Sequence, residues 1–592
     1  MKILSVHYGH NATVGLLKDG KVVFCQSEER INHLKNSTGF PALTLDYVYK
    51  TFGKDIDLVV LPGVSLVSYA FLKNSGFQSR RYLDYFSNTR PRNLSFLIRY
   101  FLYKYFSKFT SWYWLNKVKK YQQKLDNDKK LKKEAYEYFS KAIGVDESKI
   151  IFLDHHQAHA YSPCFNLDLN KKTLVFTLDG EGDYFSGSVN IYHQGKLETI
   201  STISRFNSLG GLYSEVTGFL GMKPNEDEYK VMGLAPYAKI KSSQVERIYQ
   251  KFKNLIYLDE NLEIKSKIPS GLFGYYLFEQ INYERFDNVA AALQSFLEEI
   301  VIRWVSGWIK KTDIHEIALS GGVFMNVKLN QKISELDEVK SIFVMPSAGD
   351  ESLVFGCMFY GYKEYCDKNK LPFSPQPFTD LYLGRNFKDE EIEEFLQNSE
   401  DIKKYKIEKL TDVEAAVADL LAKNQIVALF SGAMEWGARA LGNRSILANP
   451  SSRESVMIIN EMIKNRDFWM PFACSVLEED FDRYFKNPKK IFAPYMVITF
   501  NSTDIAKKEL IAGLHAYDFT GRPQCVRKDW NPSYHRLISE FKKRTGIGGV
   551  LNTSFNLHGE PLVYGPEEAL HTFINSGLKY LVLGKYLIKK PE

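Results

Sequence analysis

The chain has 592 residues, more than a single hydrophobic core organises, since cores stop growing near ~250–300 residues. Its hydrophobic share of 44% and charged share of 25% are those of a globular protein, and they exclude a mostly disordered, collagen-like or coiled-coil chain. No run approaches the ~18 apolar residues of a membrane span, and the N-terminus lacks the features of a secretory signal. Six scattered cysteines predict free thiols and a reducing, cytoplasmic setting.

The net charge of +7 is modest, but it is distributed unevenly along the chain. Residues 71–133 hold 16 Lys and Arg against 3 Asp and Glu, which gives this segment +13 and leaves −6 for the remainder. One segment therefore carries the basicity of the whole protein.

The chain opens with short β-strands. Runs rich in β-forming residues cover Met1–Tyr8, Ala12–Leu17 and Val22–Ser27, and the Asp-Gly pair between the last two is typical of a tight hairpin. Further strands are expected at Ile56–Leu61, Ile150–Leu153, Thr173–Leu178, Ile314–Ser320 and Ser341–Met345, with helices between them such as Val289–Lys310. Strands that alternate with helices predict an α/β domain around a central sheet, and the opening hairpin makes that sheet mixed. No internal sequence repeat is evident.

Residues 71–133 interrupt this pattern with 16 aromatic residues among the basic ones. We interpret them as an inserted helical subdomain. The simpler interpretation is a helical cap whose aromatic side chains pack and whose basic groups are solvated. The alternatives are a surface for an acidic acceptor, a nucleic acid or a membrane, because interleaved basic and aromatic residues suit phosphates and stacked bases.

A Pro-rich stretch at residues 371–377 is the best candidate for a linker. We therefore expect an N-terminal domain at residues 1–370, a linker and connecting segment at 371–407, and a second α/β domain at 408–592. In this second domain Val413–Lys423 has a helical pattern and Gln425–Phe430 has the pattern of a strand.

Two histidines and two carboxylates follow predicted strands. His155 and His159 come after Ile150–Leu153 and are four residues apart, so on a helix their side chains share one face. Asp179 follows Thr173–Leu178, and Asp350 follows Ser341–Met345, at the strand ends where α/β sheets usually bind ligands. Two imidazoles with one or two carboxylates and open positions suit iron(II), manganese or zinc, although each pattern alone also fits a structural role.

Small residues end another predicted strand. Ser320, Gly321 and Gly322 are followed by Asn326. Such residues let the backbone approach a phosphate, and the amides at the next helix start can bind it. Glycine pairs are also common as plain turns.

Basic residues recur beside glycine in the C-terminal half. They are Arg439, Arg444, Lys464, Arg466 and Arg522. If these groups converge, they bind a polyphosphate or a carboxylate; the alternative is a scattered, solvated surface. Arg439 and Arg444 lie among Ala, Leu and Gly, which favours a pocket.

Taken together, these motifs resemble the NodU/CmcH family of O-carbamoyltransferases. The matching blocks are spread over nearly the whole chain: residues 9–12, 28–30 with Lys35, 154–160, 179–180, 229–237, 320–323, 349–350, 439–444, 551–556 and 559–561. Residues 71–133 match no block of the family.

The resemblance implies two domains with different chemistry. The N-terminal domain would have the actin-like ATPase (ribonuclease-H-like) fold with a helical basic insertion, and the C-terminal domain would be a YrdC-like α/β domain. The second domain would form carbamoyl-adenylate from carbamoyl phosphate and ATP, with Mg²⁺ expected beside the ATP. The first would transfer the carbamoyl group to an acceptor hydroxyl and release AMP.

The resemblance also implies a role for each matched residue. His155, His159, Asp179 and Asp350 would bind Fe²⁺ or another divalent metal, and His10 would take the proton of the acceptor hydroxyl. The carbamoyl-adenylate would be contacted by Lys35, Ser320, Gly321, Gly322 and Asn326. ATP and carbamoyl phosphate would be bound by Arg439, Arg444, Lys464, Arg466, Arg522, Asn552 and Ser554.

Two positions depart from the family pattern. Many relatives have Asp where this chain has Asn11, and Arg where it has Met470. An amide cannot act as a carboxylate beside His10. At Met470 a phosphate contact is missing unless another residue, such as Arg444 or Arg453, supplies it.

We therefore expect an ATP-dependent O-carbamoyltransferase whose acceptor is a hydroxyl of a sugar, an antibiotic or another specialised metabolite. Two alternatives stay open. One is the same chemistry on a nucleic acid, such as a hydroxymethylated base or a tRNA, which only residues 71–133 favour. The other is a catalytically inactive nucleotide-binding protein, which only Asn11 and Met470 support.

Overall fold

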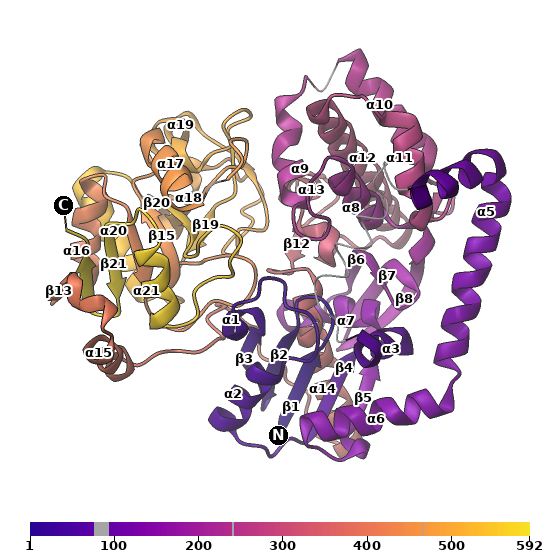
Figure 1. Cartoon of the computed structure of the whole chain (residues 1–592), viewed down its shortest axis with the longest axis horizontal. Coiled ribbons are helices and arrows are strands. Elements are labelled where there is room, and N and C mark those ends of the chain that lie inside the picture. The colour runs from indigo at the N-terminus through magenta and orange to yellow at the C-terminus, as the bar shows by residue number, and fades with distance from the viewer. Residues whose placement is uncertain (76–93, 240–241, 465, 592) are drawn as a thin grey trace. The chain divides into compact units, whose positions relative to one another are not determined.

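The computed structural model describes residues 1–75, 94–239, 242–464 and 466–591, which form two compact units (Figure 1). Unit 1 comprises Met1–Val23 and Asn36–Pro377, and unit 2 comprises Phe24–Lys35 and Phe378–Glu592. Of the expected linker, residues 371–377 lie in unit 1 and residues 378–407 in unit 2. The short segment 24–35 thus belongs to unit 2, although it lies within the N-terminal part of the sequence.

Unit 1 is built on two five-stranded sheets that share one strand pattern. The first has the order β3-β2-β1-β4-β5 and the second the order β8-β7-β6-β11-β12. In each sheet, three consecutive strands form a meander whose first strand pairs in parallel with a fourth, and the fourth pairs in parallel with a fifth. The expectation of one central sheet is therefore wrong, whereas the mixed character of the sheet is confirmed.

Eight strands of unit 1 coincide with the predicted runs, whereas β7, β8, β9 and β10 were not predicted. The strands of the unit are β1 Lys2–His7, β2 Thr13–Lys18, β3 Lys21–Ser27, β4 Leu58–Pro62, β5 Ile150–Leu153, β6 Thr173–Gly182, β7 Phe185–His193, β8 Lys196–Ser204, β11 Glu316–Ser320 and β12 Ser341–Val344, with a separate pair, β9 Ile256–Leu258 and β10 Ile264–Ser266. β1, β2 and β4 are almost entirely buried, which is why they are near-continuous apolar runs in the sequence.

Helices cover both sheets of unit 1. They are α2 Ala42–Phe52, α3 Leu66–Ser75, α5 Leu94–Asp126, α6 Lys129–Ile143, α7 His155–Tyr161, α8 Leu209–Phe219, α9 Glu228–Leu234, α10 Ser243–Leu255, α11 Phe273–Ile281, α12 Phe286–Thr312, α13 Val327–Ser334 and α14 Leu353–Asn369. α14 packs against β1, β2 and β4, and α12 packs against α9, α10 and α13. The described part of residues 71–133 is helical, and residues 76–93 lie outside the described residues.

Unit 2 contains an eight-stranded mixed sheet of order β13-β22-β21-β14-β15-β20-β16-β19. Its strands are β13 Lys406–Lys409, β14 Val427–Phe430, β15 Arg444–Ala448, β16 Ala473–Leu477, β19 Gln524–Val526, β20 Gly549–Ser554, β21 Tyr580–Leu583 and β22 Tyr586–Lys589, and β17 Phe500–Asn501 pairs with β18 Thr520–Gly521. Its helices are α1 Glu29–Asn32, α15 Asp389–Asn398, α16 Val413–Ala422, α17 Arg453–Ile459, α18 Phe481–Tyr484, α19 Asp504–Glu509, α20 Pro532–Thr545 and α21 Pro566–Ile574.

Two further features bear on the sequence-based expectations. All six cysteines are buried and free of disulfides. Among the described residues, no helix combines the length and the hydropathy that a membrane crossing requires.

Candidate metal centre and anion site

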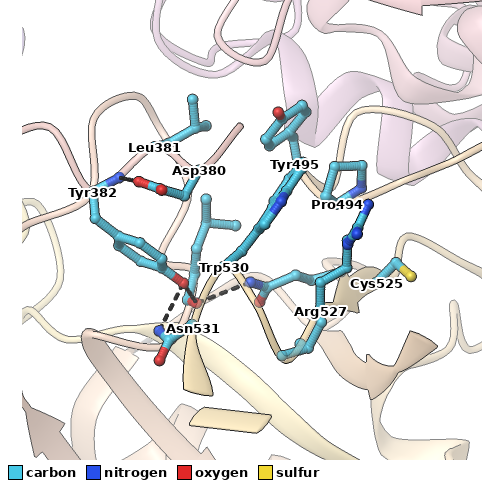
Figure 2. Close-up of a pocket in the computed structure, with 12 residues that line it drawn as sticks. Asp380, Leu381, Tyr382, Pro494, Tyr495, Cys525, Arg527, Trp530 and Asn531 are labelled. Carbon is cyan, nitrogen blue, oxygen red and sulfur yellow. Dashed lines mark hydrogen bonds between the residues drawn. The ribbon is translucent and has the colours of Figure 1, made fainter. Parts of the chain in front are cut away.

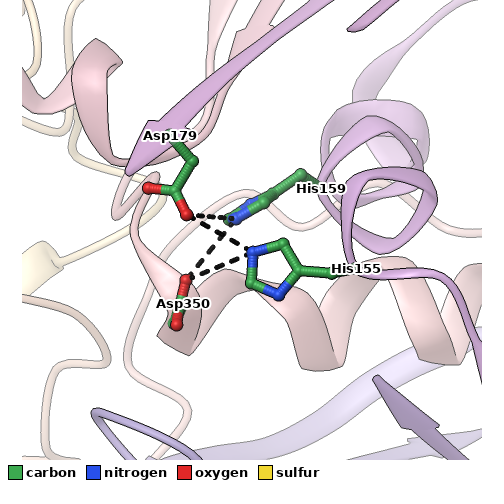
Figure 3. A group of neighbouring side chains, drawn as sticks. All are labelled: His155, His159, Asp179 and Asp350. Carbon is green, nitrogen blue, oxygen red and sulfur yellow. Dashed lines mark hydrogen bonds and ion pairs between the residues drawn. The ribbon is translucent and has the colours of Figure 1, made fainter. Parts of the chain in front are cut away.

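Helix α7 presents two imidazoles on one face, as their spacing predicts. Asp154 starts the helix, because its Oδ1 accepts a hydrogen bond from the backbone N–H of Gln157, 3.0 Å away. His155 and His159 then lie one turn apart, with ring centroids separated by 4.8 Å, and both are buried. Their Nε2 atoms face the same point (Figure 3).

Two carboxylates meet these imidazoles from other elements. Asp179 lies near the end of β6, and Asp350 lies in the turn between β12 and α14. The Nε2 of His155 is 3.3 Å from Asp179 Oδ2 and 3.6 Å from Asp350 Oδ1, and the Nε2 of His159 is 3.7 and 3.6 Å from the same two atoms. One ligand atom from each residue lies within 4.8 Å of the other three. The structure therefore brings all four predicted metal ligands together.

The charges of this group depend on one another. Burial lowers the pKa of His155, but Asp350 and the hydrogen-bonded Asp179 outweigh it and raise the pKa to about 9. Burial raises the pKa of Asp179, but the two imidazoles hold it well below its usual range. Without a metal, protons on the imidazoles thus balance the two carboxylates.

The same group fits a divalent cation. His159 Nε2 is buried and makes no hydrogen bond with the described part of the chain, so it is available to a ligand. Two neutral imidazoles and two carboxylates carry two negative charges, which a divalent ion neutralises. The donor set, two nitrogens and two carboxylate oxygens, suits iron(II), manganese or zinc.

The glycine loop after β11 orients one of the ligands. The backbone N–H of Gly322 donates a hydrogen bond to Asp179 Oδ1, 3.1 Å away. Gly321 has a φ of 96°, and a Cβ at this position would lie 2.3 Å from the carbonyl oxygen of Leu178. Only glycine therefore allows this loop to approach β6 closely enough to hold Asp179.

The turn after β6 holds the other side of the centre. Asp183 Oδ2 accepts a hydrogen bond from the backbone N–H of His155, at 2.9 Å. A Cβ on Gly182 would lie 2.1 Å from the His155 ring. Three residues beyond the candidate ligand Asp179, the end of β6 and the turn after it therefore position His155.

Ser320 and Asn326, which are expected to contact carbamoyl-adenylate, form hydrogen bonds within the protein. The Oγ of Ser320 lies 2.9 Å from the Oγ of Ser162, and both side chains are buried. Asn326 starts α13, where its Oδ1 accepts from the backbone N–H of Leu329, and its Nδ2 donates to Gln294 Oε1 at 2.8 Å. These contacts fix the loop that carries Gly321 and Gly322.

A second histidine, His7, lies beside the expected base His10. The Nε2 of His7 is 2.8 Å from the backbone oxygen of His10 and 3.9 Å from Asp350 Oδ2. Burial lowers the pKa of His7 to about 4, despite the opposing effect of Asp350. Sequence reasoning missed His7, although its place at the end of the first strand was visible.

Asn11 has a carboxyl partner of its own. It adopts a φ of 58°, and its Nδ2 lies 3.5 Å from Glu351 Oε2. Burial raises the pKa of Glu351, and its other oxygen accepts a hydrogen bond from Ser347. The amide therefore avoids placing two carboxyl groups side by side.

In unit 2 the basic residues gather in one place. Burial, followed by the charges of Arg439 and Arg466, lowers the pKa of Arg522 well below its usual range. Burial, Arg466 and Lys35 likewise lower the pKa of Lys464, whereas Glu560 opposes them. Such mutual repulsion shows that these cations lie close together, as an anion site requires.

Lys35 belongs to this group through the segment 24–35 of unit 2. The segment is held by Arg30, whose guanidinium donates to the backbone oxygen of Gly437 at 2.8 Å, and by His33, whose Nε2 lies 3.4 Å from Glu560 Oε2. The charge of Lys35 thus acts on Lys464, one of the residues expected to bind ATP and carbamoyl phosphate.

Other residues of the expected anion site make contacts within the protein. Lys464 Nζ reaches Ser554 O (2.6 Å), Asn556 O (2.9 Å) and Asn556 Oδ1 (2.5 Å). Asn552 Nδ2 donates to Ala440 O and Ser475 Oγ. These contacts fasten the end of β20 and the loop after it.

Arg444 is also engaged internally. It is completely buried, its NH1 donates to the backbone oxygen of Ser431 at 2.7 Å, and its guanidinium lies 3.7 Å from the centre of the Phe430 ring. Burial lowers its pKa to about 10. Arg522, by contrast, makes no hydrogen bond with the described residues, so its five N–H donors are the best placed to meet a ligand.

A small cavity of about 20 Å³ lies elsewhere in unit 2 (Figure 2). Tyr495 and Trp530 stack at its edge with centroids 6.0 Å apart, and Asn531 donates to the hydroxyl of Tyr382. The cavity has room for about one water molecule, and no predicted site residue lines it.

Comparisons with known proteins cover most of the chain. Residues 2–358 match the family model described as carbamoyltransferase N-terminus, and residues 418–590 match the model described as carbamoyltransferase C-terminus. The uncharacterized protein MJ1051 of Methanocaldococcus jannaschii is 30% identical over the whole of both chains. The nodulation protein NolNO of Sinorhizobium fredii is 30% identical over 98% of this chain and 79% of its own.

One relative has a name that states a reaction. The 3'-hydroxymethylcephem-O-carbamoyltransferase of Amycolatopsis lactamdurans is 24% identical over 75% of this chain and 82% of its own. Among solved structures, full-length HypF in its phosphate- and nucleotide-bound form covers 63% of this chain and 56% of its own, at 12% identity and a TM-score of 0.32. The actin-like and YrdC-like folds stay predictions.

Proposed function

The chain is an enzyme of the carbamoyltransferase family, and from this premise we propose that it is an ATP-dependent O-carbamoyltransferase with two half-reactions. In the first, carbamoyl phosphate, ATP and water give carbamoyl-adenylate, pyrophosphate and phosphate. In the second, an acceptor hydroxyl forms a bond to the carbamoyl carbon, the bond from that carbon to the phosphate oxygen breaks, and AMP leaves. The acceptor's proton goes to a base on the enzyme.

The first half-reaction is assigned to unit 2 because its cations converge. Arg522, Arg439 and Arg466 are close enough to depress the pKa of Arg522, and Lys464 and Lys35 extend the group. ATP and carbamoyl phosphate are polyanions, and bringing them together costs electrostatic repulsion that such a group offsets. Mg²⁺ bound with the ATP would share this role.

The second half-reaction is assigned to unit 1 because of the four metal ligands, and this group is the observation that carries the proposal. A divalent metal, which we propose to be Fe²⁺, would act there as a Lewis acid on the phosphate of the adenylate and so make AMP a better leaving group. The chain's own residues do the rest. Gly322 and Asp183 hold the ligands in place, and His10 takes the hydroxyl proton.

A named relative supports a small-molecule acceptor. The cephem enzyme's name states carbamoylation of a hydroxymethyl group on a small molecule. We propose an acceptor of the same kind here, a hydroxyl of a sugar, an antibiotic or another specialised metabolite.

An untargeted screen tests this function. Purified protein is incubated with ATP, isotope-labelled carbamoyl phosphate and a small-molecule extract of the source cells, and products that gain one labelled carbamoyl group are sought by mass spectrometry. Labelled products should require ATP and disappear with His155→Ala. Labelling that needs neither ATP nor the metal ligands would contradict the proposal.

A further inference from the structure

Helix α5 carries an exposed apolar stripe. Ile98, Phe101, Leu102 and Tyr105 have exposed fractions of 54%, 55%, 45% and 63%. They are spaced at i, i+3, i+4 and i+7, so they share one face of the helix. The rings of Phe101 and Tyr105 lie 4.7 Å apart on this face. Large apolar side chains that are exposed side by side mark an interaction surface.

The same helix is positively charged. From Leu94 to Leu125 the sequence contains seven Lys and Arg and no Asp or Glu. Lys104 flanks the stripe, with its Nζ 6.0 Å from the centres of the Tyr100 and Tyr105 rings. Phe106 interrupts the helix with a φ of -131° and a ψ of 31°, and beyond this kink Lys117, Lys119, Lys120 and Lys124 are exposed on the second segment. The surface therefore complements an anion.

The opposite side of α5 is held by unit 1. Tyr100, two positions from both Ile98 and Leu102, packs edge-on against Phe278 of α11 with centroids 5.2 Å apart. Lys119 lies 5.8 Å from the ring of Phe206. The contact of Tyr100 thus orients the segment before the kink, with Tyr100 toward the unit and the exposed stripe away from it. Figure 1 shows α5 bent, with a short first segment and a longer second segment that runs along the outer side of unit 1.

Its C-terminal end is fastened beside the metal centre. Gln122 Nε2 donates to the backbone oxygen of Asp183 at 2.9 Å, and Asp126 Oδ1 accepts from the backbone N–H of Leu66 at 2.8 Å. Asp183 is the residue whose carboxylate holds the backbone of His155. Gln122 of α5 therefore contacts Asp183, and Asp183 in turn contacts His155, one of the four residues of the candidate metal centre.

We propose that the segment of α5 before the kink, residues 94–105, docks parallel to the surface of an anionic lipid bilayer, with the stripe Ile98, Phe101, Leu102 and Tyr105 in the headgroup and acyl boundary. Interfacial helices combine Lys and Arg with aromatic and aliphatic side chains in this way. The aliphatic Ile98 and Leu102 favour hydrocarbon over a nucleic acid, because bases stack on aromatic rings. The excess of like charge disfavours a second copy of the same helix, since two such faces repel.

Docking would hold the metal centre at the membrane, where acceptors carried by lipids or gathered at the surface are concentrated. This consequence rests on the proposed function, but the docking itself does not. Vesicle binding is measured without substrates, so its failure leaves carbamoyl transfer untouched.

Vesicle sedimentation tests the inference. The full-length protein should sediment with vesicles of equal parts phosphatidylcholine and phosphatidylglycerol, bind much more weakly to pure phosphatidylcholine, and lose binding as salt rises. Phe101→Ser with Leu102→Ser should lower the partition coefficient about tenfold or more. Lys104→Ala should lower it about fivefold. The matched control is Met457→Ser with Ile505→Ser, two exposed apolar residues of unit 2, which should bind like the parent protein.

Three outcomes would overturn it. Equal binding by the Phe101/Leu102 variant and the control would remove the stripe from the interface. A dimer in light scattering that only the Phe101/Leu102 variant dissociates would assign the stripe to a second copy. Binding of a single-stranded oligonucleotide that these same substitutions weaken, without vesicle binding, would assign it to a nucleic acid. Unchanged circular dichroism and Tm show that the exposed substitutions preserve the fold.

Discussion

At the residue scale, the candidate metal centre comprises four side chains from three separate stretches of sequence. His155→Ala and Asp350→Ala should each lose most of the bound metal, because each removes one ligand atom of the cluster. His156→Gln is the matched control. His156 adjoins His155, but its Nδ1 bonds Thr177 Oγ1 at 3.0 Å and it is not a member of the cluster. Elemental analysis of the purified proteins decides the matter, and full metal content in His155→Ala with His159→Ala would remove these residues as ligands.

His10 is expected to act on the acceptor and not on the metal or ATP. His10→Ala should slow carbamoyl transfer by ~10²–10⁴-fold, the usual cost of a missing general base. Metal content and pyrophosphate release should stay near those of the parent protein. The neighbouring His7 is the competing candidate, because it approaches Asp350 to 3.9 Å. A normal transfer rate in His10→Ala would point to His7 or to a base on the acceptor.

Glu215 on α8 links stability to pH. Burial raises its pKa to about 7, from an ordinary value of about 4.5. The folded state therefore favours the protonated carboxyl. Its contribution to stability is complete below pH about 4.5 and is lost as pH rises through about 7.

Glu215→Gln should remove this loss. The free energy of unfolding of the variant minus that of the parent protein should be larger at pH 8 than at pH 5, by on the order of 2 kcal/mol. Urea denaturation at both pH values measures the difference, with the exposed Glu260→Gln as the control. Parallel curves for Glu215→Gln and the parent protein would show that this carboxyl is solvated.

At the element scale, the cations of unit 2 are of two kinds. Lys464 is hydrogen-bonded to the end of β20 and to the loop after it, whereas Arg522 makes no hydrogen bond with the described residues. Lys464 is bonded to Ser554 and Asn556, so Lys464→Met should lower Tm as well as pyrophosphate release. Arg522→Ala should leave Tm nearly unchanged and lower pyrophosphate release by ~10–100-fold, the usual value of a charge-assisted hydrogen bond. Arg522→Lys should recover part of the loss. Equal effects of both changes on Tm would mean that Arg522 is also structural.

Strands and helices with one dominant pattern were predictable from the sequence. β1, β5 and β14 are buried apolar runs, and α7 puts His155 and His159 on one face because their spacing matches the helical turn. The residues of the candidate metal centre could be named because His155, Asp179 and Asp350 each follow a predicted strand. β7 and β8 were not predicted, since β8 is half-exposed and its polar residues hide the pattern.

The division of the unit 1 strands into two sheets could not be predicted from the sequence, for a different reason. β1 and β6 occupy the same central position in their sheets. The two sheets repeat the order in which strands pair, but their amino-acid sequences do not repeat. The hydrogen bonds that Lys464, Arg444 and Ser320 make within the protein could not be predicted either. A motif indicates which side chains come together, but it does not indicate which of them contact each other and which contact a ligand. Long-range contacts decide that, and they depend on loop geometry.

At the scale of the whole molecule, the two units differ in chemistry. Unit 1 holds the four candidate metal ligands, and unit 2 holds the cations that lower one another's pKa, to which the segment 24–35 adds Lys35. The account therefore requires that the two half-reactions can be lost one at a time. Variants of unit 1 should still form carbamoyl-adenylate, and variants of unit 2 should still bind metal.

The most direct measurement is the first half-reaction without any acceptor. Purified protein is mixed with ATP and carbon-labelled carbamoyl phosphate, and labelled carbamoyl-adenylate and pyrophosphate are quantified. Both should form in the parent protein and in His155→Ala, and both should fall ~10–100-fold in Arg522→Ala. No labelled adenylate in the parent protein, or its loss in His155→Ala with full retention in Arg522→Ala, would contradict the account.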